Sequence, residues 1–154
     1  MDDQLEALTE ADHRLIAAAR AVIDANTDTR DADSDGVHTM GAAVRDSDGV
    51  VHVGVNLAHF TGGPCAELVA LGTARANGAR HIQAIVAVGN HGRGVVGPCG
   101  RDRQILFDYY PGIRVLLPTA EGVRATTVET LMPLAAAWTI DSGTQDFDST
   151  RFVR

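Results

Sequence analysis

From residue 38 onward, short apolar and β-branched runs alternate with helix-length segments, and this alternation constrains the fold more than any other feature. The runs that predict strands cover residues 38–45, 50–56, 82–88, 113–117 and 124–128. The segments that predict helices cover residues 9–25, 65–77, 98–110 and 129–137. Strands that alternate with helices pack as a sheet with helices on both faces. We therefore expect an α/β fold, a three-layer sandwich with crossover connections.

Local signals mark the ends of several of these elements. Thr9 and Asp12 resemble a capping box at the start of the first helix. The sequence Asp-Ser-Asp-Gly over 46–49 predicts a hairpin turn between the first two strands. Three alternating aspartates before Gly36 imitate the start of a calcium-binding loop, but the twelfth position, which needs a bidentate Glu, is Ala42. We therefore interpret residues 26–36 as a solvated acidic loop.

The length and charge of the chain limit what it binds. With 154 residues it fits one domain over residues 1–140, followed by a polar tail, 141–154, that we expect to pack on the domain or on a neighbouring subunit. A net charge of −7 argues against nucleic acid as partner. No apolar run reaches the ~20 residues that cross a bilayer. The first residues lack the features of a secretory signal, and two cysteines cannot build a disulfide scaffold. We expect a cytoplasmic protein with a free small-molecule substrate.

Two cysteines carry the strongest chemical signal, because each follows a proline at a predicted helix start. Cys65 and Cys99 would then lie at helix N-termini, whose partial positive charge lowers the pKa of a thiol and favours the metal-ligating thiolate. Asp102 lies three residues after Cys99, so one helical turn brings both side chains to one face. If the two helix starts meet, two thiolates and a carboxylate converge. A catalytic zinc site needs three such ligands and a fourth position for water. Glu67, two residues after Cys65, would lie beside that water as a proton carrier.

Plainer interpretations of the same residues stay open at this point. Two cysteines in a small domain are most often buried packing residues. Cys65 and Cys99 could also form a disulfide, although a reducing compartment disfavours one. A glutamate near a helix start is by default a solvated residue.

The residues around these cysteines resemble the cytidine deaminase superfamily, whose zinc signature is His or Cys-x-Glu followed by Pro-Cys-x-x-Cys. The likeness to fungal blasticidin S deaminases is closer. It is carried by GVNLAHFTGGPCAEL over 54–68, IVAVGNHGR over 85–93 and GPCGRDRQILFDYYPG over 97–112. The similarity extends from residue 38 to residue 138. It implies a cytidine deaminase-like α/β/α sandwich with one mixed five-stranded sheet, and a homotetramer.

The sequence departs from the family at one metal ligand. Asp102 stands where the family has the second Cys of Pro-Cys-x-x-Cys. Oxygen is an accepted zinc ligand, and three anionic ligands keep the formal charge of the site unchanged. We therefore expect zinc to be bound through Cys65, Cys99 and Asp102. The alternative is a weakened or empty site, that is, a catalytically degenerate, zinc-poor nucleoside-binding protein.

The resemblance implies a zinc-dependent hydrolytic deaminase, a hydrolase acting on a C–N bond. The substrate class is a free aminopyrimidine nucleoside, of cytidine or blasticidin S type, or a related small heterocycle. In this chemistry zinc lowers the pKa of a bound water, and Glu67 moves the water's proton to the ring nitrogen before ammonia leaves. A nucleic-acid deaminase would need a basic channel, which the net charge disfavours. A serine hydrolase would need a G-x-S-x-G elbow, and the sequence has none.

Further site residues are implied by position in the matched motifs. Arg93 corresponds to an arginine that donates to the zinc thiolates, with an exposed loop arginine as the plain alternative. Asn56 corresponds to an asparagine that contacts the sugar, and Ala66 is counted with it among the substrate-binding residues. Trp138 resembles an aromatic that closes the site, often the site of a neighbouring subunit, and core packing is its alternative. His38 corresponds loosely to a base-stacking Phe, or else faces solvent.

Two alanines separate this chain from its nearest family. Blasticidin S deaminases have a Tyr at each of the positions that Ala58 and Ala136 occupy here, and cytidine deaminases have a ribose-binding Glu at the first. Because alanine enlarges the pocket and removes a donor or acceptor, neither cytidine nor blasticidin S is assured as the substrate.

Overall fold

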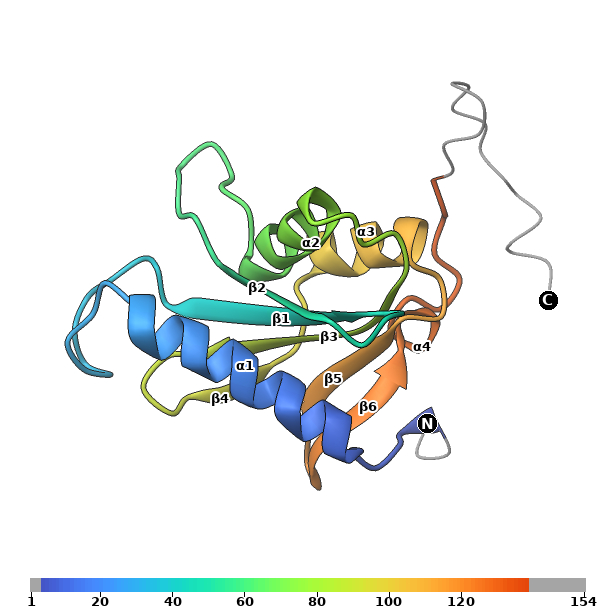
Figure 1. Ribbon diagram of the computed structural model, residues 1–154, viewed down its shortest axis with the longest axis horizontal. Coiled ribbons are helices and arrows are strands. Elements are labelled where there is room, and N and C mark those ends of the chain that lie inside the picture. Colours follow the sequence, from blue (N-terminus) through green and yellow to red (C-terminus); the bar gives the residue numbers. More distant parts are fainter. Residues whose placement is uncertain (1–3, 139–154) are drawn as a thin grey trace.

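The computed structural model describes residues 4–138, as four helices and six strands in the order α-β-β-α-β-β-α-β-β-α (Figure 1). The helices are α1 (Glu10–Asn26), α2 (Ala66–Ala76), α3 (Gly100–Tyr109) and α4 (Val128–Leu131). The strands are β1 (Met40–Asp46), β2 (Val51–Val55), β3 (Ile82–Gly89), β4 (Gly94–Val96), β5 (Arg114–Thr119) and β6 (Gly122–Thr127). The predicted tail over 141–154 lies outside the described residues.

The strands form one mixed sheet. Its main order is β2-β1-β3-β5-β6, and β4 pairs with the end of β3 off this path. β3 and β5 are parallel, because α3 lies between them in the chain as a crossover, and the other pairs are antiparallel. The predicted α/β fold with a mixed sheet is confirmed. The main path holds the five strands that the sequence predicts, and β4 makes the sheet six-stranded.

Helices cover both faces of the sheet, which gives the three predicted layers. Figure 1 shows α1 across one face, and α2 and α3 together on the other. Successive residues of β1 and β3 point alternately to these two layers. Those that face α1 pack with it in one cluster, which contains Leu15, Ile16, Ala19, Ala43, Ala84, Val86 and Val88. Those that face α2 and α3 pack in a second cluster, which contains Ala42, Val44, Ala70, Leu71, Ile85, Ala87 and Leu106. β3 is therefore buried on both faces, which explains its nearly continuous apolar sequence.

Two glycine positions set how closely α1 and α2 approach the sheet. A Cβ atom on Gly54 of β2 would lie 2.4 Å from the backbone nitrogen of Ala70 in α2. A Cβ atom on Gly41 of β1 would lie 2.6 Å from the carbonyl oxygen of Ala19 in α1. The backbones of α1 and α2 thus pack closely against the backbones of β1 and β2, which fixes the distance between α2 and the sheet.

The start of α1 is held as the sequence predicts. Thr9 accepts a hydrogen bond from the Asp12 backbone, and the Asp12 carboxylate accepts one from the Thr9 backbone, which completes the capping box. The fully buried Asp12 also accepts hydrogen bonds from Arg114 of β5 at 3.0 and 3.1 Å. This ion pair fastens the helix start to the sheet.

Two element predictions differ from the structure. The segment 94–96, expected to belong to a glycine-rich loop, forms the short strand β4 against Ala87, Val88 and Gly89. The predicted helix over 129–137 is only the four-residue α4. It ends at Leu131 because Pro133 restricts the residue before it, and Leu134 has a positive φ of 59°. Within residues 4–138, no helix has the length and apolar character needed to cross a membrane.

Candidate active site

The two cysteines occupy equivalent positions on two neighbouring helices. Cys65 is the N-cap residue of α2 and Cys99 that of α3, both with extended backbone. The two helices lie together on one face of the sheet (Figure 1). Their first turns meet, so that the Sγ atoms of Cys65 and Cys99 are 3.8 Å apart. The predicted convergence of the two helix starts is therefore present, and at this separation the sulfurs are free thiols without a disulfide bond.

Asp102 completes a three-residue cluster. Its Oδ2 atom lies 3.2 Å from the Sγ of Cys99, one turn further along α3. One ligand atom from each of Cys65, Cys99 and Asp102 can be chosen so that all three lie within 4.8 Å of one another. Asp102 is 1% exposed, and its second oxygen, Oδ1, is buried without a hydrogen-bond partner among residues 4–138. A buried carboxylate oxygen without a partner is costly, which indicates that the cluster is built for a cation.

The donor set and its spacing fit zinc. Two thiolates and one carboxylate form a catalytic-type ligand set that leaves a fourth tetrahedral position open. Two sulfurs each about 2.3 Å from a tetrahedral ion would lie about 3.8 Å apart. The Sγ atoms of Cys65 and Cys99 are separated by this same distance, 3.8 Å. Softer thiolate ligands select against magnesium and calcium.

The electrostatics of the cluster differ from the sequence-based expectation. Burial, followed by the carboxylate of Asp102 and the neighbouring Cys99, raises the pKa of the Cys65 thiol to about 12. The sequence predicts that the helix N-terminus lowers this pKa. In the structure, the burial of the thiol and the negative charge beside it outweigh that effect. A divalent cation between the three groups reverses this balance, because it stabilises the thiolate directly.

Glu67 lies in the first turn of α2, two residues beyond Cys65. It is only 6% exposed, and burial, followed by the nearby charge of Asp102, raises its pKa to about 7. A carboxyl group with a pKa near neutrality can both take up and release a proton at physiological pH. The cluster therefore combines a candidate metal ligand, Asp102, with a carboxyl group, Glu67, that can exchange a proton near neutral pH.

These residues form one wall of a pocket of about 410 Å³. The remaining lining comes from the start of β1, the β2–α2 loop with the first residue of α2, and the end of β4 with the residue after it: Met40, Asn56, Leu57, Ala58, His59, Gly62, Gly63, Pro64, Ala66, Val96 and Gly97. Ala66 and Asn56 are thus brought to the same pocket as Cys65, Cys99, Asp102 and Glu67. Among the described residues, the lining contains no Asp or Glu besides Glu67 and Asp102, and it contains no Lys or Arg.

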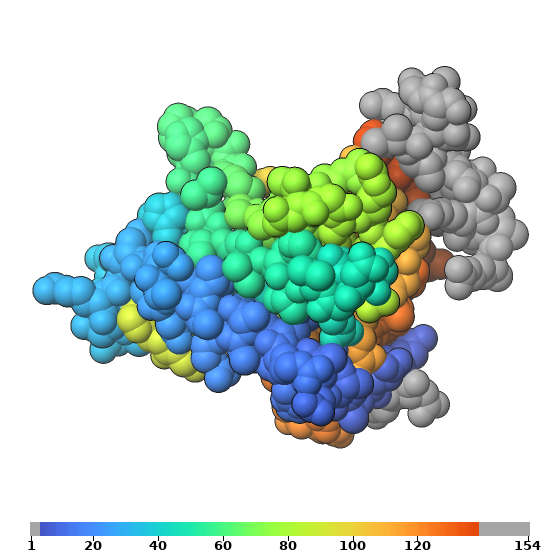
Figure 2. Space-filling model, viewed as in Figure 1, coloured from blue at the N-terminus to red at the C-terminus, as the bar shows by residue number. Residues whose placement is uncertain are grey.

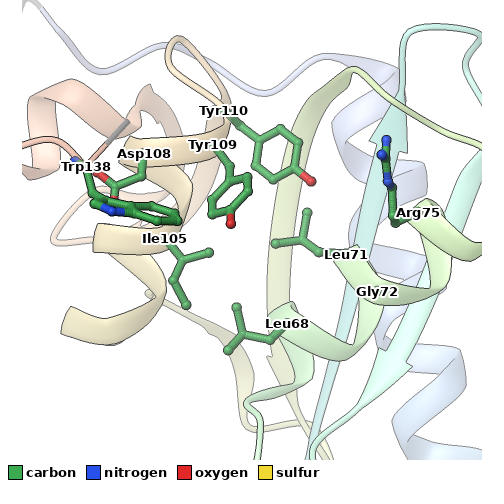
Figure 3. Close-up of a pocket in the computed structure, with 9 residues that line it drawn as sticks. All are labelled: Leu68, Leu71, Gly72, Arg75, Ile105, Asp108, Tyr109, Tyr110 and Trp138. Carbon is green, nitrogen blue, oxygen red and sulfur yellow. Dashed lines mark hydrogen bonds between the residues drawn. The ribbon is translucent and has the colours of Figure 1, made fainter. Parts of the chain in front are cut away.

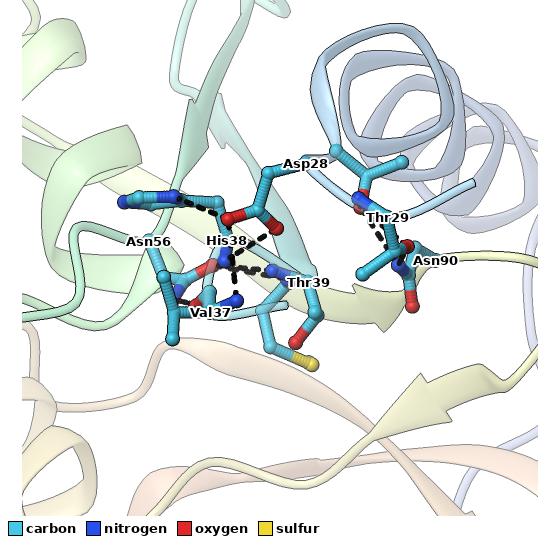
Figure 4. A network of polar contacts seen from close by, with 9 residues as sticks. Asp28, Thr29, Val37, His38, Thr39, Asn56 and Asn90 are labelled. Carbon is cyan, nitrogen blue, oxygen red and sulfur yellow. Dashed lines mark hydrogen bonds and ion pairs between the residues drawn. The ribbon is translucent and has the colours of Figure 1, made fainter. Parts of the chain in front are cut away.

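Asn56 is held by the backbone in front of β1 (Figure 4). Its Oδ1 atom accepts hydrogen bonds from the amides of Thr39 and Met40 at 3.1 and 3.0 Å. Its Nδ2 atom donates to the carbonyl of Val37 at 2.7 Å. The second Nδ2 hydrogen has no partner among the described residues. A contact of Asn56 with a sugar stays a prediction. The side chain already has a structural task, which is to fix the pocket edge formed by residues 37–40.

Arg93 lies in the loop between β3 and β4. Its guanidinium donates to Asn90 at 3.0 Å and to the carbonyl of Thr39 at 2.6 Å, and it lies 3.8 Å from the sulfur of Met40, a pocket residue. Among the contacts of residues 4–138, none joins Arg93 to a cysteine sulfur. The predicted donation to the thiolates stays a prediction, and the described contacts make Arg93 a support of the pocket edge.

Two predicted site residues lie apart from the pocket lining. His38 pairs with Asp28 at 3.0 Å just before β1 (Figure 4). Trp138 lies beside Tyr109 of α3, with ring centroids 6.0 Å apart, and lines a separate cavity of about 510 Å³ between α2 and α3 (Figure 3). Their roles in stacking on a base or in closing a site stay predictions.

Sequence reasoning missed several pocket residues, of which Met40, His59 and Val96 have side chains that shape the wall. Met40 and Val96 belong to strand ends, where nothing in the local pattern distinguishes a wall residue from a core residue. His59 belongs to the segment 54–68 that carries the family resemblance. Its position close to the cysteine motif could have indicated that it lines the pocket.

Comparison with known proteins agrees with this geometry. No protein-family model matches the sequence. Over 109 residues the chain is 35% identical to a blasticidin-S deaminase of Bacillus cereus, an alignment covering 65% of this chain and 78% of that protein. The chain belongs to the cytidine deaminase superfamily. The membership assigns it to the hydrolytic deaminases, which act on C–N bonds, as the sequence predicts.

Solved structures of the superfamily share the fold. The crystal structure of cytidine deaminase from Mycobacterium leprae is similar with a TM-score of 0.63 and 27% identity, covering 79% of this chain and 96% of that one. Cytidine deaminase from Burkholderia pseudomallei is similar with a TM-score of 0.62 and 31% identity, covering 83% and 99%. The cytidine deaminase-like sandwich is therefore confirmed.

Proposed function

We propose that this deaminase-family protein is a zinc-dependent hydrolase that removes the amino group of a free aminopyrimidine nucleoside or a related small heterocycle. The observation that carries the proposal is the meeting of Cys65, Cys99 and Asp102 beside the buried Glu67, in one pocket of about 410 Å³. Cys65, Cys99 and Asp102 would hold the zinc ion. When bound, zinc supplies Lewis-acid activation of water at neutral pH.

Glu67 is the proton carrier of the proposed reaction. Its carboxylate takes a proton from the attacking water and delivers it to the ring nitrogen beside the amino-bearing carbon. It then takes the second proton, from the hydroxyl now on the ring carbon, and passes it to the amino group, so that the C–N bond breaks, the oxygen becomes a carbonyl and ammonia leaves. The burial that raises the pKa of Glu67 to about 7 supports both directions of transfer.

The pocket supports a small substrate without a phosphate group. The described lining has no Lys or Arg, and the four anionic groups Cys65, Cys99, Asp102 and Glu67 would outweigh the charge of a zinc ion, so a phosphate would enter without a compensating charge. A free nucleoside or base avoids this cost. The relatives' names point the same way, since one is a blasticidin-S deaminase and others are cytidine deaminases. A homotetrameric assembly and a cytoplasmic location stay predictions from the sequence.

The replacement of a family cysteine by Asp102 favours one alternative, a zinc-poor protein that binds nucleosides without turnover. The two functions differ in two measurable properties, zinc content and ammonia release. A degenerate protein would bind a nucleoside while purifying with little zinc and releasing no ammonia.

The test combines metal quantitation with an ammonia assay on cytidine, deoxycytidine, blasticidin S and purine bases. We expect stoichiometric zinc and ammonia release from at least one compound. Glu67→Gln should abolish release, by at least about 100-fold, while zinc content stays unchanged. Glu10→Gln, which changes an exposed glutamate of α1, is the matched control and should behave as wild type. Stoichiometric zinc with no release from any compound would contradict the proposal.

A further inference from the structure

The β2–α2 loop forms the outer wall of the proposed substrate pocket. It projects from the molecule between β2 and α2 (Figure 1), and it is the green protrusion at the top of the space-filling view (Figure 2). His59 is the one pocket-lining residue of this loop with a titratable side chain before the cysteine motif begins. Its ring packs against Phe60, with centroids 4.4 Å apart. Phe60 is 94% exposed and lies outside the pocket lining, to which His59 belongs, so the ring pair lies at the surface of the loop.

The backbone contact of His59 indicates which ring nitrogen carries its proton. The backbone N–H of Thr61 points to Nδ1 of His59 at 3.2 Å. A backbone amide can only donate, so Nδ1 accepts with its lone pair. The hydroxyl of Thr61 lies 2.5 Å from the same nitrogen and shares this one lone pair with the amide. In an uncharged imidazole with Nδ1 as the acceptor, the single proton is on Nε2.

The Nε2–H group is left as a free donor. Within residues 4–138, Nε2 of His59 has no hydrogen-bond partner, whereas Nδ1 has two. The contacts with Thr61 and Phe60 hold the ring, so little rotational freedom is lost when a ligand binds. The other uncommitted N–H donor among the described lining side chains is the second Nδ2 hydrogen of Asn56, whose remaining polar positions are bonded to residues 37–40.

From this arrangement we infer that His59 is a specificity-determining residue, whose Nε2–H donates a hydrogen bond to an acceptor oxygen of an uncharged substrate in the pocket. The inference rests on the proposed function for the identity of that substrate as a nucleoside-like compound. An uncharged imidazole recognises a carbonyl or hydroxyl oxygen without requiring a phosphate, in agreement with a lining that contains no Lys or Arg.

Two amide substitutions separate the two nitrogens of the ring. In His59→Asn, the shorter side chain places its Oδ1 near the position of Nδ1, where it can still accept from the Thr61 backbone and keep the turn. It has no donor at the position of Nε2. In His59→Gln, the longer side chain carries an N–H donor out to about the position of Nε2. Thr61→Val removes the hydroxyl contact alone, and is the control for a purely structural role of the loop.

The experiment measures the dissociation constants of cytidine and blasticidin S by titration calorimetry, with each substitution placed in the Glu67→Gln background so that no turnover occurs. The compound that this background binds more tightly is the probe. We expect His59→Asn to weaken binding of the probe about 3- to 10-fold, the range of one hydrogen bond. His59→Gln should recover part of this loss, and Thr61→Val should stay within about twofold. In the active enzyme, His59→Asn should raise KM with kcat and zinc content unchanged.

Equal dissociation constants for His59→Asn and its parent would overturn the inference, as would failure of both compounds to bind. A loss in Thr61→Val as large as that in His59→Asn would also overturn it, because the loop conformation would then explain both. Failure of the proposed function is a different result, namely no ammonia from the wild-type enzyme. The binding comparison still decides the role of His59 in that case.

Discussion

The Sγ atom of Cys99 lies 3.2 Å from Oδ2 of Asp102, three residues further along the first turn of α3. A helix brings side chains at this spacing to one face, so the carboxylate reaches the position that a second cysteine of the same motif would occupy. Asp102 is buried, and its other oxygen, Oδ1, has no partner among the described residues. The relationship therefore identifies Asp102 as a ligand candidate and predicts how its substitution changes metal binding.

Asp102→Asn should lower zinc affinity by at least about 10-fold, because the substitution removes one of three negative charges around the ion. Asp102→Cys should keep stoichiometric zinc, since it places a third thiolate at the same helical position. The measurement is zinc content after dialysis against a series of chelator concentrations, read by mass spectrometry of the metal.

Asp108→Asn is the matched control, because Asp108 lies on the same helix and bonds Gln104 and the Trp138 backbone away from the cysteines. It should retain zinc as the wild type does. If Asp102→Asn also retains zinc over the whole chelator series, Asp102 is not a ligand and the substituted site works through two cysteines alone.

Local sequence patterns predicted most of the fold. The capping box of α1, the hairpin between β1 and β2 and the buried strand β3 depend on neighbouring residues, and each was correctly located. β4 was missed because Gly94–Val96 is a strand only through pairing with the end of β3. The last helix was predicted too long because Met132 precedes Pro133 in an otherwise apolar, helix-like segment.

The site was predictable where its geometry is local. Cys99 and Asp102 share a helical turn, so their proximity follows from spacing. The meeting of Cys65 with Cys99, 34 residues away, needed the packing of two helices and came from the family resemblance. The free nitrogen of His59 could not be predicted, because it depends on which atom the Thr61 backbone contacts.

Gly54→Ala should destabilise the protein by about 1–3 kcal/mol, because the added methyl group would meet the backbone of α2. The helix start that carries Cys65 would move with it, so zinc affinity should fall in the same variant. Gly72→Ala within α2 is the matched comparison, since a Cβ there meets nothing within 4 Å. It should stabilise by about 0.5–1 kcal/mol through helix propensity. Urea unfolding of the two variants tests the difference, and equal stabilities would contradict the close approach of β2 and α2.

Asn56→Ala should destabilise the pocket edge before β1, because three hydrogen bonds to residues 37–40 are lost at once. We expect a loss of about 2–3 kcal/mol, from about 1 kcal/mol for each bond. Asn26→Ala removes a side-chain bond at the exposed end of α1 and should cost less than about 1 kcal/mol. Hydrogen exchange should show faster exchange at the amides of Thr39 and Met40 in Asn56→Ala alone. Unchanged exchange there would show that the backbone pairing of β1 holds the edge without Asn56.

The buried Asp12 should make the fold sensitive to acid. Burial by itself raises the pKa of Asp12, but hydrogen bonds from the Thr9 backbone and from Arg114 outweigh it and hold the pKa below its ordinary value. Asp12 in the unfolded chain takes up its proton near pH 4, and folded Asp12 does so only at lower pH. Its contribution to stability is therefore complete above about pH 4 and is lost as the pH falls through the folded pKa.

Asp12→Asn should cost about 3 kcal/mol at pH 7, because it leaves the charge of Arg114 without its buried partner. It should also flatten the loss of unfolding free energy between pH 5 and pH 2, since one of the carboxylates that couple unfolding to proton uptake is gone. Glu10→Gln, on the exposed side of the same helix, should leave this slope unchanged. Urea titrations at a series of pH values provide the comparison. If the unfolding free energy of Asp12→Asn falls with pH as steeply as that of the wild type, other carboxylates cause the acid sensitivity. Asp46 is then the next residue to substitute, because a hydrogen bond from His52 holds its pKa below the ordinary value.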